Sequence, residues 1–343
     1  MKQMTRKRSE FPSNLGSFSV PNPKRATGGT GSFEDELIFP YYAGFSMQFA
    51  SSLLARWKEV YGGVVVDPWN GSGTVTSAAS RLGIQSVGID LNPVMVLVAK
   101  TRLLSRHDVG SIVPLGTHIL EESKNEKIYI NNDDLLHNWF DRPSVRIIKQ
   151  VEAVINRLLV SESAYQSLTN SEHLGEISSL GAFFYVSMFR TIRSILKQFT
   201  TTNPTWIKKA KTDSELIHIT RTHLGQLYLT NIRILSELLA LIPVDEHEKI
   251  STKILSCDSA EMPLETESVD FVLTSPPYCT RIDYAVATSP ELAVIGMNQA
   301  EFKALRQRLI GTSSVAPEGL TPRSLWGPSC NTFLSSIQTH SSK

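Results

Sequence analysis

A short loop at residues 275–278 combines residue types that could hold a flat ring bearing an amino group. Ser275 Oγ and the carbonyl oxygen of Pro276 can accept hydrogen bonds, and Pro277 stiffens the loop beside the aromatic face of Tyr278. Two acceptors on the amine hydrogens would direct the nitrogen lone pair at an electrophile. No strong base is needed, because the amine can attack first and lose its proton afterwards. The plainer alternative is a Pro-Pro turn at the end of a strand.

A second candidate site is the loop Asp67–Thr74, which follows a β-branched run and contains Gly71 and Gly73. Glycines allow a ligand to approach the backbone closely. Asp90 ends the next expected strand, where an acid could accept hydrogen bonds from ribose hydroxyls, so we predict a nucleoside-bearing cofactor. The loop lacks the lysine of a triphosphate-binding loop and the full G-x-G-x-x-G pattern typical of NAD sites. The alternative is a glycine turn that only packs, with Asp90 capping the next helix.

A parallel α/β sheet would bring these loops together. The stretches 62–83 and 85–100 each suggest a strand followed by a helix, and their unbroken apolar strands fit burial on both faces. The apolar run Val269–Thr274 is expected to be another strand, placed next to the first. Open α/β sheets bind ligands at the carboxyl ends of their strands, so the candidate loops should share one edge.

The two loops together resemble the S-adenosylmethionine-dependent amino-methyltransferases of DNA. D-P-W-N-G-S-G-T is similar to the family's D-P-F-x-G-S-G-T cofactor loop, and T-S-P-P-Y is similar to its catalytic [DNS]-P-P-[YFW] motif. The segment from Phe39 to Trp57 resembles one that precedes the cofactor loop and closes over the methionine moiety. Residues 255–264 resemble the family's third-strand acidic segment. The resemblance covers residues 38–104 and 250–300.

The resemblance implies a Rossmann-like α/β fold, S-adenosylmethionine as cofactor and DNA as partner. It places Asp67 and the two glycines at the methionine end, Asp90 at the ribose and Asp258 near the adenine. The implied cofactor residues are Phe45, Asp67, Pro68, Trp69, Gly71, Ser72, Gly73, Thr74, Asp90 and Asp258, and the implied catalytic residues are Ser275, Pro276, Pro277 and Tyr278.

The type of base is suggested by the first residue of the catalytic motif. In the family, serine at the place of Ser275 is commonest among cytosine-N4 enzymes, and aspartate among adenine-N6 enzymes. The resemblance therefore implies methyl transfer to cytosine N4, with adenine N6 as the alternative and RNA or protein amines less favoured. Because a base inside duplex DNA is not reachable, base flipping is implied.

Residues 105–248 form an insertion between the second and third expected strands. Apolar residues recur there at spacings of three and four over residues 142–160, 180–199 and 214–242, which predicts helices. Basic residues in and after this segment could position a duplex through its phosphates, although a solvated face is the alternative. These candidate DNA contacts are Arg190, Arg193, Lys197, Lys208, Lys209 and Arg281.

The C-terminal region departs from the family plan, in which three more strands normally follow the S-P-P-Y strand. Here the sequence suggests only a helix, Pro290–Leu309, and a Ser/Thr/Pro-rich stretch. We therefore expect a sheet that is incomplete at its C-terminal side, with Val269–Thr274 as an unpaired apolar edge. A second chain could complete the sheet, or the chain could be a shortened relic that binds without turnover.

Composition limits the remaining possibilities. The chain has 343 residues, 41% of them hydrophobic, and a net charge of +1, so nucleic-acid contacts must come from local patches. No apolar run reaches membrane-span length and the N-terminus lacks a secretory pattern, so we expect a soluble protein. The three widely spaced cysteines form no C-x-x-C pair, which argues against a metal site and fits a reducing cytoplasm.

The predicted organisation has four parts. A flexible basic tail comes first and is either a solvated leader or an arm that touches phosphates. The two parts of the methyltransferase domain follow, separated by the helical insertion. Their boundaries are 1–33 for the tail, 34–104 for the cofactor-binding part, 105–248 for the insertion, and 249–343 for the catalytic part with its C-terminal tail.

Overall fold

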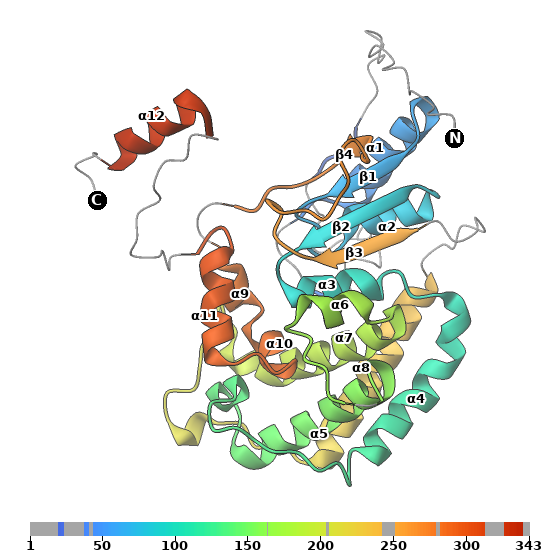
Figure 1. The fold of residues 1–343 in the computed structure, drawn as a ribbon. Coiled ribbons are helices and arrows are strands. Elements are labelled where there is room, and N and C mark those ends of the chain that lie inside the picture. The colour runs from blue at the N-terminus through green and yellow to red at the C-terminus, as the bar shows by residue number, and fades with distance from the viewer. Residues whose placement is uncertain are drawn as a thin grey trace.

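A parallel four-stranded sheet lies at the centre of the part of the chain that the structure describes (Figure 1). The structure is a computed structural model and describes residues 20–23, 38–40, 44–162, 164–203, 206–241, 251–278, 282–312 and 326–338. The strands are β1 (Val64–Asp67), β2 (Gln85–Asp90), β3 (Thr252–Ser256) and β4 (Phe271–Val272), in the order β3-β2-β1-β4. All pairs are parallel, which confirms the predicted α/β class and the position of the fourth strand beside the first.

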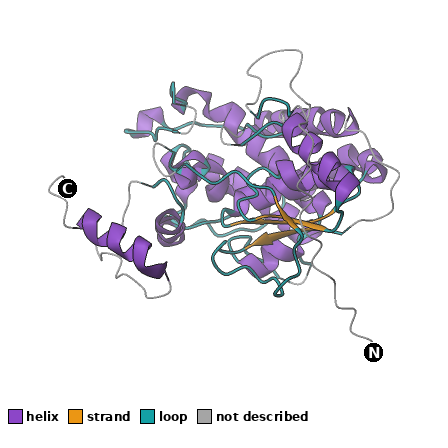
Figure 2. Cartoon of the chain, turned by 90° about the horizontal axis from the view of Figure 1, so that it is seen from above, coloured by secondary structure: helices purple, strands orange, loops and turns teal. Residues whose placement is uncertain are grey.

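The two faces of the sheet are covered differently. Helices α1 (Met47–Val60) and α2 (Thr74–Arg81) pack on the face of Val65, where Trp57 stacks on Phe271 with ring centroids 5.2 Å apart. On the opposite face, the small cluster around Val66 is covered by side chains from the loop between β3 and β4. Seen from above, most helices accordingly lie on one side of the strands (Figure 2).

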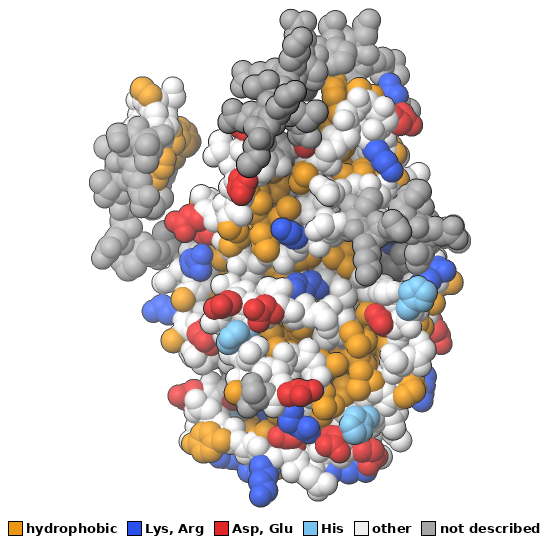
Figure 3. Space-filling model, turned by 45° about the vertical axis from the view of Figure 1, so that its right-hand side comes forward, with side chains coloured by type: hydrophobic (Ala, Val, Ile, Leu, Met, Phe, Trp, Pro, Cys, Tyr) orange, Lys and Arg blue, Asp and Glu red, His pale blue; other side chains and the backbone are white. Residues whose placement is uncertain are grey.

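The surface carries both signs of charge. On the face in Figure 3, lysine and arginine groups are interspersed with aspartate and glutamate groups, in keeping with the net charge of +1. None of the described helices combines the length and the apolar character that a membrane crossing needs.

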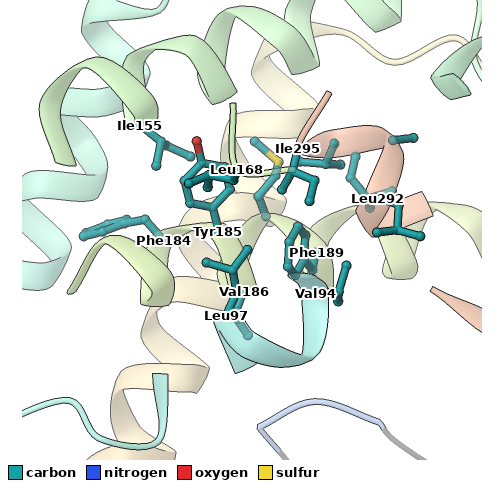
Figure 4. Packing of buried hydrophobic residues seen from close by; sticks show 14 of the residues in the cluster. Val94, Leu97, Ile155, Leu168, Phe184, Tyr185, Val186, Phe189, Leu292 and Ile295 are labelled. Atoms are coloured by element: carbon teal, nitrogen blue, oxygen red, sulfur yellow. The ribbon is translucent and has the colours of Figure 1, made fainter. Parts of the chain in front are cut away.

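The predicted insertion is helical. It contains the helices α4 (Val109–Glu122), α5 (Arg142–Leu159), α6 (Ser171–Glu176), α7 (Ser179–Ile195) and α8 (Arg221–Leu241). Its short 3₁₀ turns are η2 (Arg106–Asp108), η3 (Leu135–Asn138), η4 (Leu196–Phe199) and η5 (Asp213–Glu215). The largest core cluster joins this segment to α3 (Pro93–Thr101), the helix that follows β2. Figure 4 shows Val94 and Leu97 of α3 beside Val186 and Phe189 of α7. The insertion therefore shares its core with a helix of the sheet unit.

The prediction of one helix over Pro290–Leu309 is wrong. The structure has α9 (Tyr284–Ala287), α10 (Ser289–Val294) and α11 (Gln299–Arg308). Gly296 adopts a left-handed conformation with φ of +87°, which ends α10. Asn298 and Glu301 then form a capping box that starts α11. A final helix, α12 (Gly327–Gln338), stands apart from the remaining helices in Figures 1 and 2.

The fourth strand lies at an edge of the sheet, as expected. It is shorter than the predicted strand Val269–Thr274 and pairs with β1 through Phe271 and Val272. Within the described ranges, no strand pairs with its other edge, and Val272 is 55% exposed.

Candidate functional site

A cavity of about 300 Å³ lies at the carboxyl ends of the strands. The loops after all four strands contribute to its wall, together with the segment before α1 and the end of α11. Its lining includes Phe45, Asp67, Pro68, Trp69, Gly71, Ser72, Thr74, Asp90, Asp258, Ser275, Pro276, Pro277 and Tyr278. The structure thus brings the predicted cofactor and catalytic residues together in one cavity, with the exception of Gly73.

A hydrogen bond joins the two motif loops directly. Thr274 Oγ1 donates to Asp67 Oδ1 at 2.6 Å, and the backbone N–H of Trp69 donates to the same oxygen at 3.1 Å. Asp67 is 3% exposed, and this burial raises its pKa to about 7, although both hydrogen bonds act in the opposite direction. The first residue of the glycine loop is therefore held by the residue that precedes Ser275.

Asp90 fixes the glycine loop from the second strand. Its Oδ2 accepts a hydrogen bond from the backbone N–H of Gly71 and its Oδ1 accepts one from Asn92, each at 2.8 Å. Burial raises the pKa of Asp90 to about 6, against the effect of these backbone donors. The N-cap of α3 is Asn92, whose side chain accepts a hydrogen bond from the N–H of Val94 at 3.1 Å. Asp90 is therefore not the cap of this helix, which was the alternative role considered for it.

The two glycines of the loop have different roles. Both have positive φ values, +48° at Gly71 and +84° at Gly73. Gly71 lines the cavity, but a Cβ at Gly73 would lie 2.8 Å from the Cβ of Ala99 on α3. Gly73 therefore allows α2 and α3 to pack closely, and its contact with a ligand stays a prediction.

The T-S-P-P-Y loop, predicted to be catalytic, is held by its backbone, while the side chains of Ser275 and Tyr278 remain accessible. The N–H of Tyr278 donates to the hydroxyl of Tyr284 at 3.0 Å, and Tyr284 itself lines the cavity. A Cβ at Gly311, where φ is +90°, would lie 2.7 Å from the carbonyl oxygen of Tyr278. The chain after α11 therefore packs closely against this loop. Ser275 and Tyr278 remain exposed, Tyr278 to 61%.

Several site residues were missed by sequence reasoning. Thr274 is the first residue of the T-S-P-P-Y motif and Tyr284 follows Tyr278 by six residues, so their nearness in the sequence was a usable signal. Asn92 donates from Nδ2 to Thr288 Oγ1 at 2.9 Å and thereby connects the end of β2 to the helices after the catalytic loop. Arg308, with Nη2 3.5 Å from Asp258 Oδ2, had no local signal, because α11 places it there through tertiary packing.

The predicted DNA contacts are separated by the fold. The guanidinium of Arg193 pairs with the buried Glu291 and also donates to the carbonyl oxygen of Ala287. Arg190 donates to the carbonyl oxygen of Ile38 at 2.8 Å. Both arginines thus make contacts within the chain, which leaves less of their guanidinium groups for phosphates, and their role as DNA contacts stays a prediction.

The remaining predicted contacts are lysines on the surface. Lys197, Lys208 and Lys209 are exposed. Arg281 and most of the predicted basic tail, residues 1–33, lie outside the described residues. In the part of the chain that the structure describes, no group of three or more His, Cys, Asp or Glu side chains is arranged to hold a metal ion.

Comparison with known proteins gives similarity to one kind of enzyme. The chain is 23% identical over 303 residues to the Type II methyltransferase M.BsoBI of Geobacillus stearothermophilus, covering 78% of this chain and 54% of that protein. It is 23% identical over 298 residues to the Type II methyltransferase M.AvaI of Anabaena variabilis, covering 79% and 56% respectively. The Type II methyltransferase M.MjaII of Methanocaldococcus jannaschii is 29% identical over 99 residues, covering 29% and 18%.

The similarity covers only part of the length of the relatives. The chain spans about half the length of the first two relatives, M.BsoBI and M.AvaI. No family model matches it, and no solved structure matches it. Over most of its own length, the chain is similar to Type II methyltransferases.

Proposed function

We propose that the chain acts in the S-adenosylmethionine-dependent methylation of DNA, on the exocyclic amine of a base, with cytosine N4 preferred. The observation that carries this proposal is the 2.6 Å hydrogen bond from Thr274 to Asp67, by which the T-S-P-P-Y loop and the D-P-W-N-G-S-G-T loop form one cavity. The similarity to Type II methyltransferases supports it and favours a role in restriction–modification.

The residues of the cavity fit a cationic ligand that carries hydroxyl groups. Asp67 and Asp90 present carboxylates whose pKa values are raised by burial, so a nearby positive charge would favour their ionised forms. Asp90 and Asp258 would receive the ribose and the adenine, and Asp67 with Phe45 would hold the methionine end. S-adenosylmethionine, when bound there, supplies an electrophilic methyl group.

The catalytic loop would hold the flipped base. Ser275 Oγ and the Pro276 carbonyl oxygen accept the two amine hydrogens, and the exposed ring of Tyr278 stacks on the base. The hydrogen bond from the backbone N–H of Tyr278 to the hydroxyl of Tyr284 would fix the backbone that carries this ring. Alignment is then the main catalytic contribution, and the nitrogen loses its proton to solvent after attack. The serine favours cytosine N4, and adenine N6 is the alternative.

A second candidate function is a binding module without turnover, or one part of an enzyme completed by another polypeptide. The observation that favours it is the edge position of β4, which has no further partner strand within the described residues. An exposed apolar edge such as that of Val272, 55% exposed, is a template for pairing with another strand. A second chain that adds a strand there would also extend the wall around the catalytic loop.

One experiment separates these proposals. The purified chain is incubated with S-adenosylmethionine carrying a labelled methyl group and duplex DNA of mixed sequence, and the DNA is digested to nucleosides. The first proposal expects N4-methylcytosine, and a Ser275→Ala variant serves as the control that should lose it. N6-methyladenine would move the preference to adenine. Cofactor binding without any methylated nucleoside would favour the binding module.

A further inference from the structure

A hairpin in the helical insertion presents an exposed tryptophan among lysines. Thr200 and Ile207 form an antiparallel bridge, and the N–H of Lys208 donates to the carbonyl oxygen of Phe199 at 2.9 Å. Ile207 is 5% exposed and points into the core, so its neighbours Trp206 and Lys208 point outward. Trp206 is 46% exposed. We call Lys197, Trp206, Lys208 and Lys209 the Trp206 patch.

The patch is held firmly on the core. The indole N–H of Trp139, a fully buried side chain, donates to the carbonyl oxygen of Lys208 at 2.7 Å. Two residues further on, the N–H of Ala210 donates to the carbonyl oxygen of Asn138 at 2.9 Å. The exposed side chains therefore sit on a backbone whose position is fixed from inside, which limits the entropy lost when a partner binds.

The charged side chains of the patch are all positive. Among the described residues, Lys197, Lys208 and Lys209 take part in no ion pair. The acids that follow in the chain belong to the next turn, where Glu215 accepts from the backbone N–H of Lys211 at 2.7 Å. Three exposed lysines within a short stretch of chain that also carries an exposed tryptophan suit a polyanion with rings, since lysines neutralise phosphates and an aromatic side chain offers a flat apolar face.

The patch follows α7 in the chain, and α7 contacts the helices that come after the catalytic loop. Lys197 follows Arg193 by four residues, about one helical turn. Arg193 contacts Ala287 of α9 and Glu291 of α10, the helices that directly follow the catalytic loop (Figure 1). Lys197 therefore lies about one helical turn from a residue that contacts these helices.

We propose that the Trp206 patch is a docking surface for the sugar–phosphate backbone of duplex DNA. The three lysines neutralise phosphates and the Trp206 ring packs against a sugar beside them. The identity of the partner rests on the proposed function, but docking itself requires neither cofactor nor methyl transfer. The surface positions the duplex and carries no sequence information.

The test is binding of a fluorescently labelled duplex to the full chain over a series of salt concentrations. Each phosphate contact contributes about 0.9 to the slope of log K against log salt, so the variant Lys197→Gln/Lys208→Gln/Lys209→Gln should lower the slope by about 2.7. Over a fourfold change in salt this amounts to a difference of roughly 40-fold in affinity. Trp206→Ala should weaken binding with the slope unchanged, because it removes an apolar contact and no charge.

A control variant removes the same charge elsewhere. Lys127→Gln/Arg233→Gln/Lys253→Gln replaces three exposed basic residues outside the patch and should leave the slope unchanged. Equal slopes in the patch and control variants would overturn the proposal, and so would a wild-type chain that does not bind the duplex. Failure of the proposed methylation would appear separately, as salt-dependent binding without methylated nucleosides. Preferred binding of RNA over duplex DNA would also contradict the stated partner.

Discussion

Replacing Thr274 with valine removes the hydrogen bond between the two motif loops while nearly preserving the shape of the side chain. Asp67 is 3% exposed and accepts from Thr274 at 2.6 Å, so its carboxylate loses a close donor in a place that water scarcely reaches. A hydrogen bond to a charged group contributes about 1.5–3 kcal/mol, which corresponds to a loss of roughly 10- to 150-fold in affinity for a ligand that needs the ionised carboxylate.

The expected loss depends on pH. The hydrogen bond from Thr274 lowers the pKa of Asp67, so its removal raises that pKa further above about 7. We expect Thr274→Val to bind S-adenosylmethionine weakly at pH 7 and to regain affinity as the pH rises and Asp67 ionises. Isothermal titration calorimetry from pH 6 to 9 measures both effects. Thr274→Ser retains the hydroxyl and is the matched control.

The reasoning would be refuted by a particular pattern in these titrations. If Thr274→Val and Thr274→Ser bind the cofactor equally at every pH, the contact between the loops has no role in binding. If Thr274→Val loses affinity equally at all pH values, the loss comes from altered packing and not from the ionisation of Asp67. Thermal melting of each variant shows whether the fold is retained.

Other perturbations of the cavity give distinct outcomes. Asp90→Ala should weaken S-adenosylmethionine binding by about 1–3 kcal/mol in calorimetric titration, and unchanged affinity would remove this acid from the site. Ser275→Ala and Tyr278→Ala should abolish most methyl transfer while leaving cofactor affinity nearly unchanged; a large loss of cofactor affinity would contradict the assignment of these residues to the base. The raised pKa of Asp67 means that the folded state without ligand holds a proton more tightly than the unfolded state does. Its contribution to the free energy of unfolding should therefore decrease as the pH rises from about 4 to about 7, and Asp67→Asn should flatten this part of the pH profile in thermal melting.

Local patterns predicted the part of the site that depends on strand ends. The β-branched run before Asp67 and the apolar run before Ser275 are each followed by turn residues, and parallel pairing brings such loops to one edge. The packing role of Gly73 depends on Ala99, which only the folded chain places beside it. The partner of Arg193 is Glu291, so its charge looked available in the sequence although the fold uses it.

The difference between local patterns and tertiary contacts also explains why Pro290–Leu309 was predicted as one helix and is two. Its apolar residues fit one helical period, but Gly296 takes a left-handed conformation and Asn298 begins a new helix. The break lets α11 return towards the strand ends, where Arg308 meets Asp258 in the cavity wall. A local period cannot show such a reversal, because its benefit comes from contacts with residues far away in the sequence.

The helical segment between β2 and β3 contacts α10, the second helix after the T-S-P-P-Y loop, at several points. Lys149 of α5 donates to the carbonyl oxygen of Ala293 at 2.8 Å, at the end of α10. Arg193 of α7 pairs with Glu291 in the same helix, whose side chain is fully buried. Asn92, at the end of β2, donates to Thr288 at its start. Helix α10 is thus held both by the helical segment and by the residue that caps α3 after β2. Helix α10 cannot shift without breaking these contacts. We therefore expect the helical segment to help fix the position of the T-S-P-P-Y loop at the cavity. The same segment carries the Trp206 patch.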